Sequence, residues 1–305
     1  MEKNVLVIGA NGLLGTVFRT FVGEKYTYAV RNYADEKFPT DIAIGDISEL
    51  SIERDAELFA NFDIVINCAA VTDVDGIEND WKIRENAMKS NFKGVARLAE
   101  ICKHNNSTLI HISSDYVFDG RLGREYFPTD VRKPINQYGE TKLMGENVIL
   151  NSGCKHIIIR TSWLYSPYTP NFVTKMIDNA MDNQCVVGTN NVISSPTSAI
   201  QLVKAIEHII DSNLDYNVGI YHFTDAGCCT KYDIMSFIYD KIKNEGLITV
   251  KPDSYWESNT QRPFCSILSK ENFINTFKYS PWSWMKNIGE CIDEYKKLRD
   301  ENNNN

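Results

Sequence analysis

Short apolar segments alternate with longer amphipathic ones through the first half of the chain. The apolar segments have the continuous hydrophobic character of strands that are buried on both faces of a parallel sheet. They cover residues 4–8, 26–32, 41–46, 63–67 and 108–112. The amphipathic segments between them predict helices over residues 16–22, 48–60 and 80–104. Strands and helices in this alternating order form a parallel sheet with right-handed crossovers, so we expect a doubly wound α/β fold.

The alternation becomes less regular after a sixth predicted strand at residues 156–160. Further helices are predicted over residues 171–181, 196–210 and 231–244, and further strands over 185–188 and 219–223. We expect the 196–210 helix and the 219–223 strand to pack back on the sheet. The C-terminal part contains three tryptophans and has the loop and aromatic character of a lid over a ligand. These tryptophans are Trp256, Trp282 and Trp284.

A glycine-rich turn follows the first predicted strand, and a helix follows the turn. Its three glycines have the spacing G-x-x-G-x-x-G, which differs from the more familiar G-x-G-x-x-G. Glycines permit a tight turn and close approach of the backbone to a ligand, and the N-terminus of the next helix attracts a pyrophosphate. The turn therefore predicts a dinucleotide site. The residues expected to contact the cofactor there are Gly9, Asn11, Gly12, Leu13, Leu14 and Gly15.

These patterns predict a Rossmann-type domain and a smaller substrate-binding domain that is interleaved with it. The first comprises residues 1–162 and about 195–222. The second comprises about 163–194 and 223–300, and the polar end at 301–305 is expected to fray.

Arg31 ends the second predicted strand. At this point NAD enzymes carry an acidic residue, which binds the ribose 2′-hydroxyl. A guanidinium suits a 2′-phosphate instead, so Arg31 favours NADPH, with NADH as the alternative. A charged residue in a variable surface loop would give the same pattern.

Tyr138 and Lys142 are four residues apart in a segment with helical character, so their side chains lie on one face. An ammonium there is expected to lower the pKa of the phenol from its usual value of about 10, because it favours the phenolate. Such a tyrosine can exchange a proton with a carbonyl oxygen or an alcohol. Alone the pair is a weak signal, since Y-x-x-x-K also occurs on exposed helices.

Ser113 and Ser114 follow the strand predicted at 108–112. In open α/β sheets, ligands lie beyond the carboxyl ends of the strands. This placement puts the Ser114 hydroxyl where a reacting carbonyl group would be, and it supplies the third member of a Ser–Tyr–Lys set.

These motifs together resemble the extended short-chain dehydrogenase/reductases and, within them, the dTDP-4-dehydrorhamnose reductase family. The resemblance covers nearly the whole chain. Besides the glycine turn it rests on residues 67–72, 113–120, 138–142, 160–165, 171–172, 195–198 and 262–263. It implies NAD(P)H-dependent reduction of the 4-keto group of a nucleotide-linked 4-keto-6-deoxy sugar, most closely dTDP-4-dehydro-L-rhamnose. It also implies a cytoplasmic monomer or homodimer.

The resemblance assigns roles to individual residues. Tyr138 protonates the developing alkoxide, Lys142 also bonds the nicotinamide ribose, and Ser114 donates to the substrate oxygen. Further cofactor contacts fall on Asp46, Ile47, Ala69, Ala70, Thr72 and Ile112. Sugar-nucleotide contacts fall on Asp115, Tyr116, Trp163, Asn171 and Arg262.

Several of these residues could instead have purely structural roles. Asp115 would serve equally well as a capping acid, Trp163 as a core aromatic and Arg262 as a member of a surface ion pair. His111 is interpreted as a core residue. Some family members bind a metal at a dimer interface through a glutamate just after the turn. This chain has Val17 there, and we expect no metal site.

Composition narrows the class of partner. The net charge of −8 and the pI near 5.3 argue against a nucleic-acid partner. The eight cysteines have no C-x-x-C spacing, and no apolar run approaches the length of a membrane span. The start of the chain has no signal-peptide pattern. We therefore expect reduced thiols in the cytoplasm and no membrane contact.

Two other functions share this fold. Sugar-nucleotide 4,6-dehydratases need an Asp-Glu couple, whereas Asp115 is followed by Tyr116 here. The regulatory β subunit of methionine adenosyltransferase is similar in sequence but acts as a dinucleotide-binding partner protein, and that alternative stays open. The chain also departs from the reductase pattern at residues 191–194 and in the loop with Asp73 and Gly76, so the sugar is less well defined than the reaction.

Overall fold

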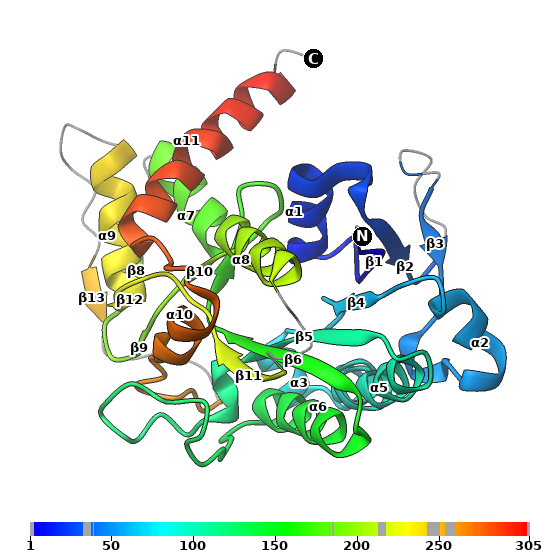
Figure 1. Ribbon diagram of the computed structural model, residues 1–305. Coiled ribbons are helices and arrows are strands. Elements are labelled where there is room, and N and C mark those ends of the chain that lie inside the picture. Colours follow the sequence, from blue (N-terminus) through cyan, green and yellow to red (C-terminus); the bar gives the residue numbers. More distant parts are fainter. Residues whose placement is uncertain are drawn as a thin grey trace.

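The computed structural model describes residues 3–32, 38, 40–182, 184, 186–212, 218–242, 251–253 and 260–303. Within these ranges, seven strands form one parallel sheet in the order β11-β6-β5-β4-β1-β2-β3 (Figure 1). The strands are β1 (Val5–Ile8), β2 (Thr27–Val30), β3 (Ile42–Ala43), β4 (Ile64–Asn67), β5 (Thr108–Ser114), β6 (Lys155–Thr161) and β11 (Gly219–His222). The predicted doubly wound α/β class is confirmed.

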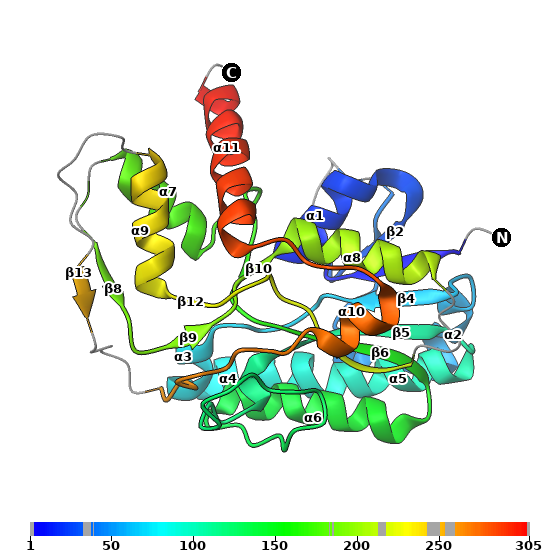
Figure 2. The same ribbon diagram turned by 60° about the vertical axis from the view of Figure 1, so that its left-hand side comes forward.

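Helices cover both faces of the sheet (Figure 2). Val5 and Val7 of β1 pack toward α1 (Leu13–Val22), α8 (Ala199–Asp211) and α10 (Glu271–Phe277). Leu6 and Ile8 point the other way. They belong to a core with residues of α2 (Ile52–Phe59), α5 (Val95–His104) and α6 (Gln137–Ser152). This alternation follows from the period of two along a strand and explains why the strands are apolar throughout.

Several element boundaries differ from the predictions. The first helix begins at Leu13, within the glycine motif and three residues before the predicted start, and β3 is much shorter than the predicted 41–46. The helix predicted over 80–104 consists of α4 (Trp81–Ala87), a π-helical segment (Met88–Gly94) and α5. Predicted strand 185–188 corresponds to β8 (Val187–Thr189), while Cys185 lies outside the described residues.

A smaller group of elements packs beside the sheet around a core of its own. It contains α7 (Phe172–Met181), α9 (Lys231–Ile242) and α11 (Trp284–Asn303). Three two-stranded pairs accompany it: β7 (Leu164–Tyr165) with β10 (Thr197–Ser198), β8 with β13 (Lys251–Asp253), and β9 (Ile193–Ser194) with β12 (Cys229–Thr230). The predicted packing of the 196–210 helix and the 219–223 strand on the sheet is confirmed, because β11 joins the main sheet and α8 packs with α1 in its core.

The expected loop character of the C-terminal part is wrong for its last twenty described residues. Residues 284–303 form the long helix α11, which projects from the body in Figure 1. Trp284, Ile288, Cys291 and Ile292 are buried, at the spacing of one helical face. The helix also includes residues 301–303 of the predicted frayed tail, while Trp256 lies outside the described residues.

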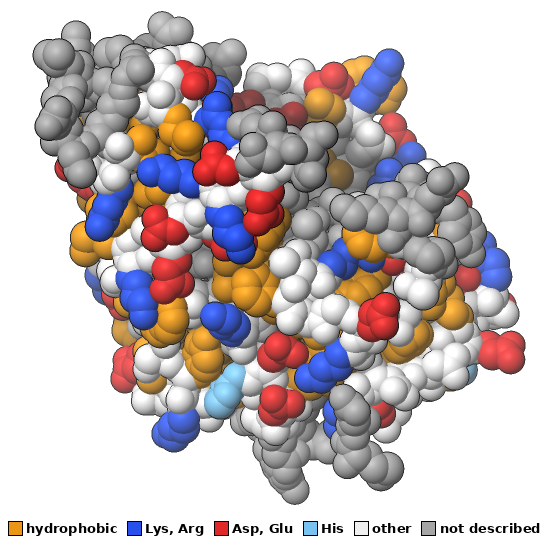
Figure 3. Space-filling view, turned by 90° about the horizontal axis from the view of Figure 1, so that it is seen from above, with side chains coloured by type: hydrophobic (Ala, Val, Ile, Leu, Met, Phe, Trp, Pro, Cys, Tyr) orange, Lys and Arg blue, Asp and Glu red, His pale blue; other side chains and the backbone are white. Residues whose placement is uncertain are grey.

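None of the described helices combines the length and the apolarity that a bilayer span requires. On the face in Figure 3, basic and acidic side chains are interspersed rather than gathered by sign.

Candidate active site

The glycine turn brings the backbone of β1 against that of β4. Gly9 has φ +80°, and a Cβ there would lie 2.6 Å from the amide nitrogen of Ala69. A Cβ on Gly15 would collide with the carbonyl oxygen of Gly9, so the third glycine allows α1 to pack on the turn. Gly12 is the N-cap of α1 and offers no side chain to the amides of the first turn. The first turn of α1 (residues 13–22, all described) carries no acidic residue. Its N–H groups are therefore open to an anion, as a pyrophosphate requires.

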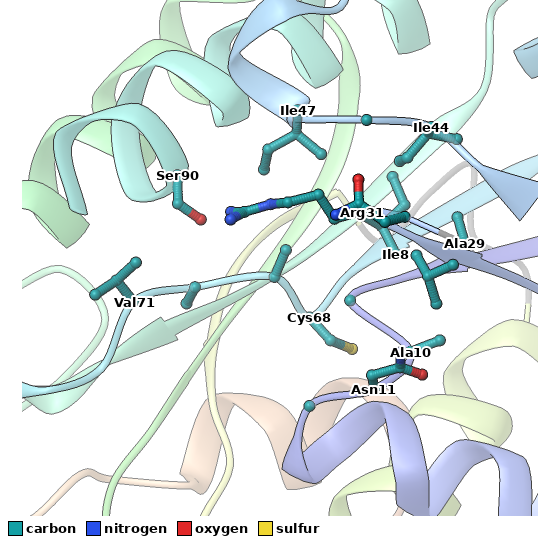
Figure 4. Close-up of a pocket in the computed structure, with 17 residues that line it drawn as sticks. Ile8, Ala10, Asn11, Ala29, Arg31, Ile44, Ile47, Cys68, Val71 and Ser90 are labelled. Carbon is teal, nitrogen blue, oxygen red and sulfur yellow. The ribbon is translucent and has the colours of Figure 1, made fainter. Parts of the chain in front are cut away.

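A first cavity of about 360 Å³ lies beyond this turn (Figure 4). Apolar side chains and small residues dominate its lining, which suits the flat apolar face of an adenine. The predicted cofactor residues on it are Gly9, Asn11, Gly12, Arg31, Ile47, Ala69 and Ala70.

Arg31 extends along this cavity toward Ser90 in Figure 4. Its side chain is 64% exposed and forms a long ion pair with Asp46, at 3.8 Å. Asp46 is bonded instead by the amide and hydroxyl of Ser48, at 2.9 and 2.8 Å. Although burial opposes the change, these bonds and Arg31 lower the pKa of Asp46. Asp46 supports the wall of the cavity but does not line it.

A second cavity, of about 410 Å³, contains the predicted catalytic set. Ser114, Tyr138 and Lys142 all line it. They come from β5 and α6, so the structure brings together residues that are separated in sequence. The predicted cofactor residues around them are Gly12, Leu13, Leu14, Ala70, Thr72 and Ile112.

The expected lowering of the pKa of Tyr138 by Lys142 is wrong. Burial raises the pKa of this phenol to about 12, and the hydrogen bond with Ser114 opposes the rise only in part. The ammonium of Lys142 donates to the carbonyl oxygen of Ile112 at 2.7 Å and is not among the groups that shift Tyr138. The phenol therefore carries its proton at neutral pH, as a proton donor must.

Lys142 lies one helical turn before Glu146, which forms a buried ion pair with Arg160 that the sequence did not reveal. Burial lowers the pKa of Lys142 to about 8, and Glu146, one helical turn later, opposes this shift. Glu146 accepts two bonds from the guanidinium of Arg160, at 2.8 and 2.7 Å, and one from Ser113 at 2.6 Å. Because β5, β6 and α6 meet in this cluster, it fixes the helix face that presents Tyr138 and Lys142. The spacing of Lys142 and Glu146 was the available signal.

Asp115 lines the second cavity, and the capping role suggested for it falls to Ser114, whose hydroxyl accepts from the amide of Tyr116. The buried carboxylate of Asp115 accepts from the hydroxyls of Ser266 at 2.5 Å, Ser114 at 3.1 Å and Ser194 at 3.5 Å. Burial raises its pKa to about 6, and these bonds oppose the rise. Ser194 and Ser266 come from distant segments, so Asp115 ties the reactive centre to the C-terminal part.

A third cavity, of about 670 Å³, contains three of the predicted substrate residues: Tyr116, Trp163 and Arg262. Tyr116 packs edge-on against Tyr138, with ring centroids 5.7 Å apart. Arg262 forms an ion pair with Asp75 at 2.7 Å, so the ion-pair alternative holds while the guanidinium still faces the cavity. Lys231 also lines the cavity and was not singled out from the sequence.

The structure gives Asn171 a different role from the predicted sugar contact. Its side-chain oxygen accepts from the amides of Val173 and Thr174 at the start of α7, and its nitrogen donates to the carbonyls of Ser166 and Thr169. Both ends of the carboxamide are thus used in capping the helix. Asn171 lines a separate cavity against α11.

The three cavities adjoin one another. The first and second share Gly12, Cys68 and Ala70, and the second and third share Val74, Tyr116 and Trp163. A ligand in the first and one in the third would therefore meet beside Ser114 and Tyr138.

Other candidate chemistry is limited in the part of the chain that the structure describes. It contains no cluster of three or more His, Cys, Asp or Glu side chains suited to a metal ion. His111 is fully buried next to Asn67, with Nδ1 3.2 Å from the amide nitrogen, which agrees with a core role. Burial lowers the pKa of His111 well below its usual value. Seven cysteines fall in the described ranges, and all are free thiols.

A doubly wound sheet, a glycine turn after its first strand, and a serine, a tyrosine and a lysine on one cavity define a short-chain dehydrogenase/reductase. The sequence profile described as "RmlD substrate binding domain" matches residues 3–297. The chain belongs to the dTDP-4-dehydrorhamnose reductase family.

Individual relatives agree with this assignment. The chain is 31% identical to dTDP-4-dehydrorhamnose reductase of Aggregatibacter actinomycetemcomitans, across 93% of this chain and 97% of the relative. It is 30% identical to that of Escherichia coli K12, across 76% of this chain and 79% of the relative. The solved structure of the Bacillus anthracis protein in complex with NADP has a TM-score of 0.83 and 29% identity, covering 96% of this chain and all of that one.

Proposed function

We propose that this protein reduces the 4-keto group of dTDP-4-dehydro-L-rhamnose to give dTDP-L-rhamnose, with NADPH as the reductant, in the cytoplasm. The observation that carries the proposal is the shared cavity of Ser114, Tyr138 and Lys142, which lies between the glycine-turn cavity and the cavity of Trp163 and Arg262. A reductase of this kind needs a dinucleotide on one side of its proton donor and a sugar nucleotide on the other.

The residues at the turn fit a dinucleotide. The close approach at Gly9 and the open N–H groups of α1 suit its pyrophosphate, and the apolar first cavity suits its adenine. When bound, the nicotinamide supplies the hydride for the carbonyl carbon. Arg31 would hold a 2′-phosphate, and the Bacillus anthracis relative was solved with NADP.

Tyr138 acts as the general acid. Its phenol is protonated at neutral pH because burial raises its pKa, so it can donate the proton to the oxygen that becomes the new alcohol. Ser114 donates a hydrogen bond to the same oxygen while negative charge develops on it. Both side chains line the second cavity, and Ser114 opposes part of the rise in the pKa of Tyr138.

Lys142 contributes positive charge beside the reacting groups. Its ammonium is oriented by the Ile112 carbonyl and supported by Glu146 beneath it. A charge in this position stabilises a phenolate on Tyr138 after the proton has left. By family resemblance its remaining donors would bond the nicotinamide ribose.

The direct test is oxidation of NADPH and NADH, followed at 340 nm, against a panel of 4-keto-6-deoxy sugars linked to dTDP, UDP and GDP. We expect the dTDP substrate with NADPH to give the highest kcat/KM. Tyr138→Phe should lower kcat by about 10²- to 10⁴-fold and leave NADPH affinity unchanged, since it removes only the acidic proton.

Tyr295→Phe on α11 is a matched control, because its hydroxyl bonds Asp178 outside the three cavities, and it should keep full turnover. Near-normal turnover of Tyr138→Phe would refute the assigned acid. Tight dinucleotide binding with no turnover on any sugar nucleotide would instead support the non-catalytic partner protein, similar to the β subunit of methionine adenosyltransferase.

A further inference from the structure

Lys231 presents its ammonium to the third cavity from the first residue of α9. The nitrogen lies 4.3 Å from the ring centroid of Trp163 and 3.9 Å from that of Phe172. Reciprocal bonds between Thr230 and Asp233 cap the helix on either side of Lys231 and fix where its side chain starts. The ammonium is therefore held over two aromatic faces.

This ammonium has no hydrogen-bond or ion-pair partner among the described residues. The ring faces offset part of the cost of removing its charge from water, but they accept none of its three N–H bonds in the manner of an oxygen. Partly buried lysines usually satisfy these donors with a carboxylate, a carbonyl or water. An anion in the cavity would supply the missing acceptors.

The surroundings of Lys231 favour an anionic ligand over a neutral one. Arg262 lines the same cavity, and its positive charge acts on Lys231 strongly enough to help lower the pKa of the lysine. Asp119, an acid on the lining, already accepts from the Tyr126 hydroxyl at 2.7 Å. Trp163 lines both the second and third cavities, so Lys231 lies at the end of the third cavity that faces Tyr138.

We propose that Lys231 binds the diphosphate of the sugar nucleotide, in a site completed by Arg262. The inference rests on the proposed function, in which the sugar lies beside Tyr138 and the nucleoside extends into the third cavity. The diphosphate joins those two parts and is the strongest anion of such a substrate. A lysine on a flexible stem contacts phosphate as a point charge and suits this linker.

The test measures nucleotide binding by calorimetry to the NADP-saturated protein, with dTDP and thymidine as probes. Lys231→Met keeps an unbranched stem over the rings and removes the charge. We expect it to weaken dTDP binding by about 10- to 100-fold, the loss typical of a hydrogen bond to a charged group, and to leave thymidine binding unchanged. The matched control is Lys286→Met. It removes a lysine of α11 that lies over the ring of Trp282, and it should change neither affinity.

The pH dependence separates a charge effect from a packing effect. Burial lowers the pKa of Lys231 to about 8, Cys229 and Asp115 oppose this shift, and Arg262 reinforces it. The affinity of the native protein for dTDP should therefore fall as pH rises above about 8. Lys231→Arg, which stays charged, should retain its affinity in that range.

Two results would overturn the inference. One is a Lys231→Met variant that folds normally and binds dTDP within twofold of the native protein; the other is an equal loss of dTDP and thymidine binding, which would give Lys231 a packing role. Failure of the proposed function is a separate outcome. If dTDP, UDP or GDP binding depends on Lys231 but no keto sugar is reduced, the anion site stands and the reductase proposal falls.

Discussion

The three adjoining cavities have a cofactor end, at the glycine turn, and a substrate end, at Trp163, and the two ends are built in different ways. At the cofactor end the backbone forms the site, since Gly9 and Gly15 allow β1, β4 and α1 to approach one another closely. At the substrate end side chains form it: Trp163, Lys231 and Arg262 come from three segments that meet only after folding. A backbone site follows from a short local sequence, whereas a side-chain site depends on tertiary packing. Changes at the first should therefore act through shape, and changes at the second through charge and contact.

The largest effect on kcat/KM for NADPH is expected from the addition of a single methyl group at the glycine turn. Gly9→Ala places a Cβ 2.6 Å from the Ala69 nitrogen at a residue with φ +80°, so β4 or the turn must shift. A displacement of about 1 Å at a reacting site can cost about 10²-fold in rate, and we expect kcat/KM for NADPH to fall by at least that factor. Binding of dTDP should be retained, because the third cavity does not include this turn.

Gly289→Ala is the matched control for the methyl group. A Cβ at Gly289 in α11 meets no atom within 4 Å, so this variant should keep native kinetics. Equal NADPH kinetics for Gly9→Ala and Gly289→Ala would show that the backbone does not form the cofactor site. Thermal unfolding of both variants would separate a local shift from a general loss of folding.

A smaller effect is expected at Arg31, the one charged side chain on the lining of the first cavity within the described residues. Arg31→Ala should raise the KM for NADPH about tenfold and leave the KM for NADH unchanged, because only NADPH carries the 2′-phosphate. Arg97→Ala on α5 removes a similar exposed guanidinium, paired with Glu100, and serves as the control. A parallel rise in KM for both cofactors would contradict the assigned contact.

The same contrast explains what the sequence revealed and what it did not. The strands of the sheet, the glycine turn and the Tyr138–Lys142 pair depend on local patterns, and all were predicted. The pKa shift of Tyr138 was predicted in the wrong direction because its burial depends on packing between α6 and other segments. Lys231 was missed because its partners, Trp163 and Phe172, lie 68 and 59 positions earlier in the chain.

The long C-terminal helix shows a related limit. The aromatic residues near Trp282 and Trp284 were interpreted as a lid, although Trp284 begins α11. The helical spacing from Trp284 to Ile292 was present in the sequence, but the polar residues between them masked it. Buried contacts with α7 and α9 stabilise this helix, and those contacts are not visible from one segment alone.

The prediction with the smallest expected effect concerns Asn171, and it tests whether this residue caps α7 or contacts the substrate. If it only caps α7, Asn171→Ala should lower the free energy of unfolding by about 1–2 kcal/mol, as expected when an N-cap side chain is lost. Asn171→Asp keeps the oxygen that accepts from Val173 and Thr174 but not the donors to Ser166 and Thr169, so it should lose about half as much stability. Both variants should keep the native KM for the sugar nucleotide. A KM raised more than fivefold at native stability would return Asn171 to the substrate site, and the substrate end would then extend along the start of α7.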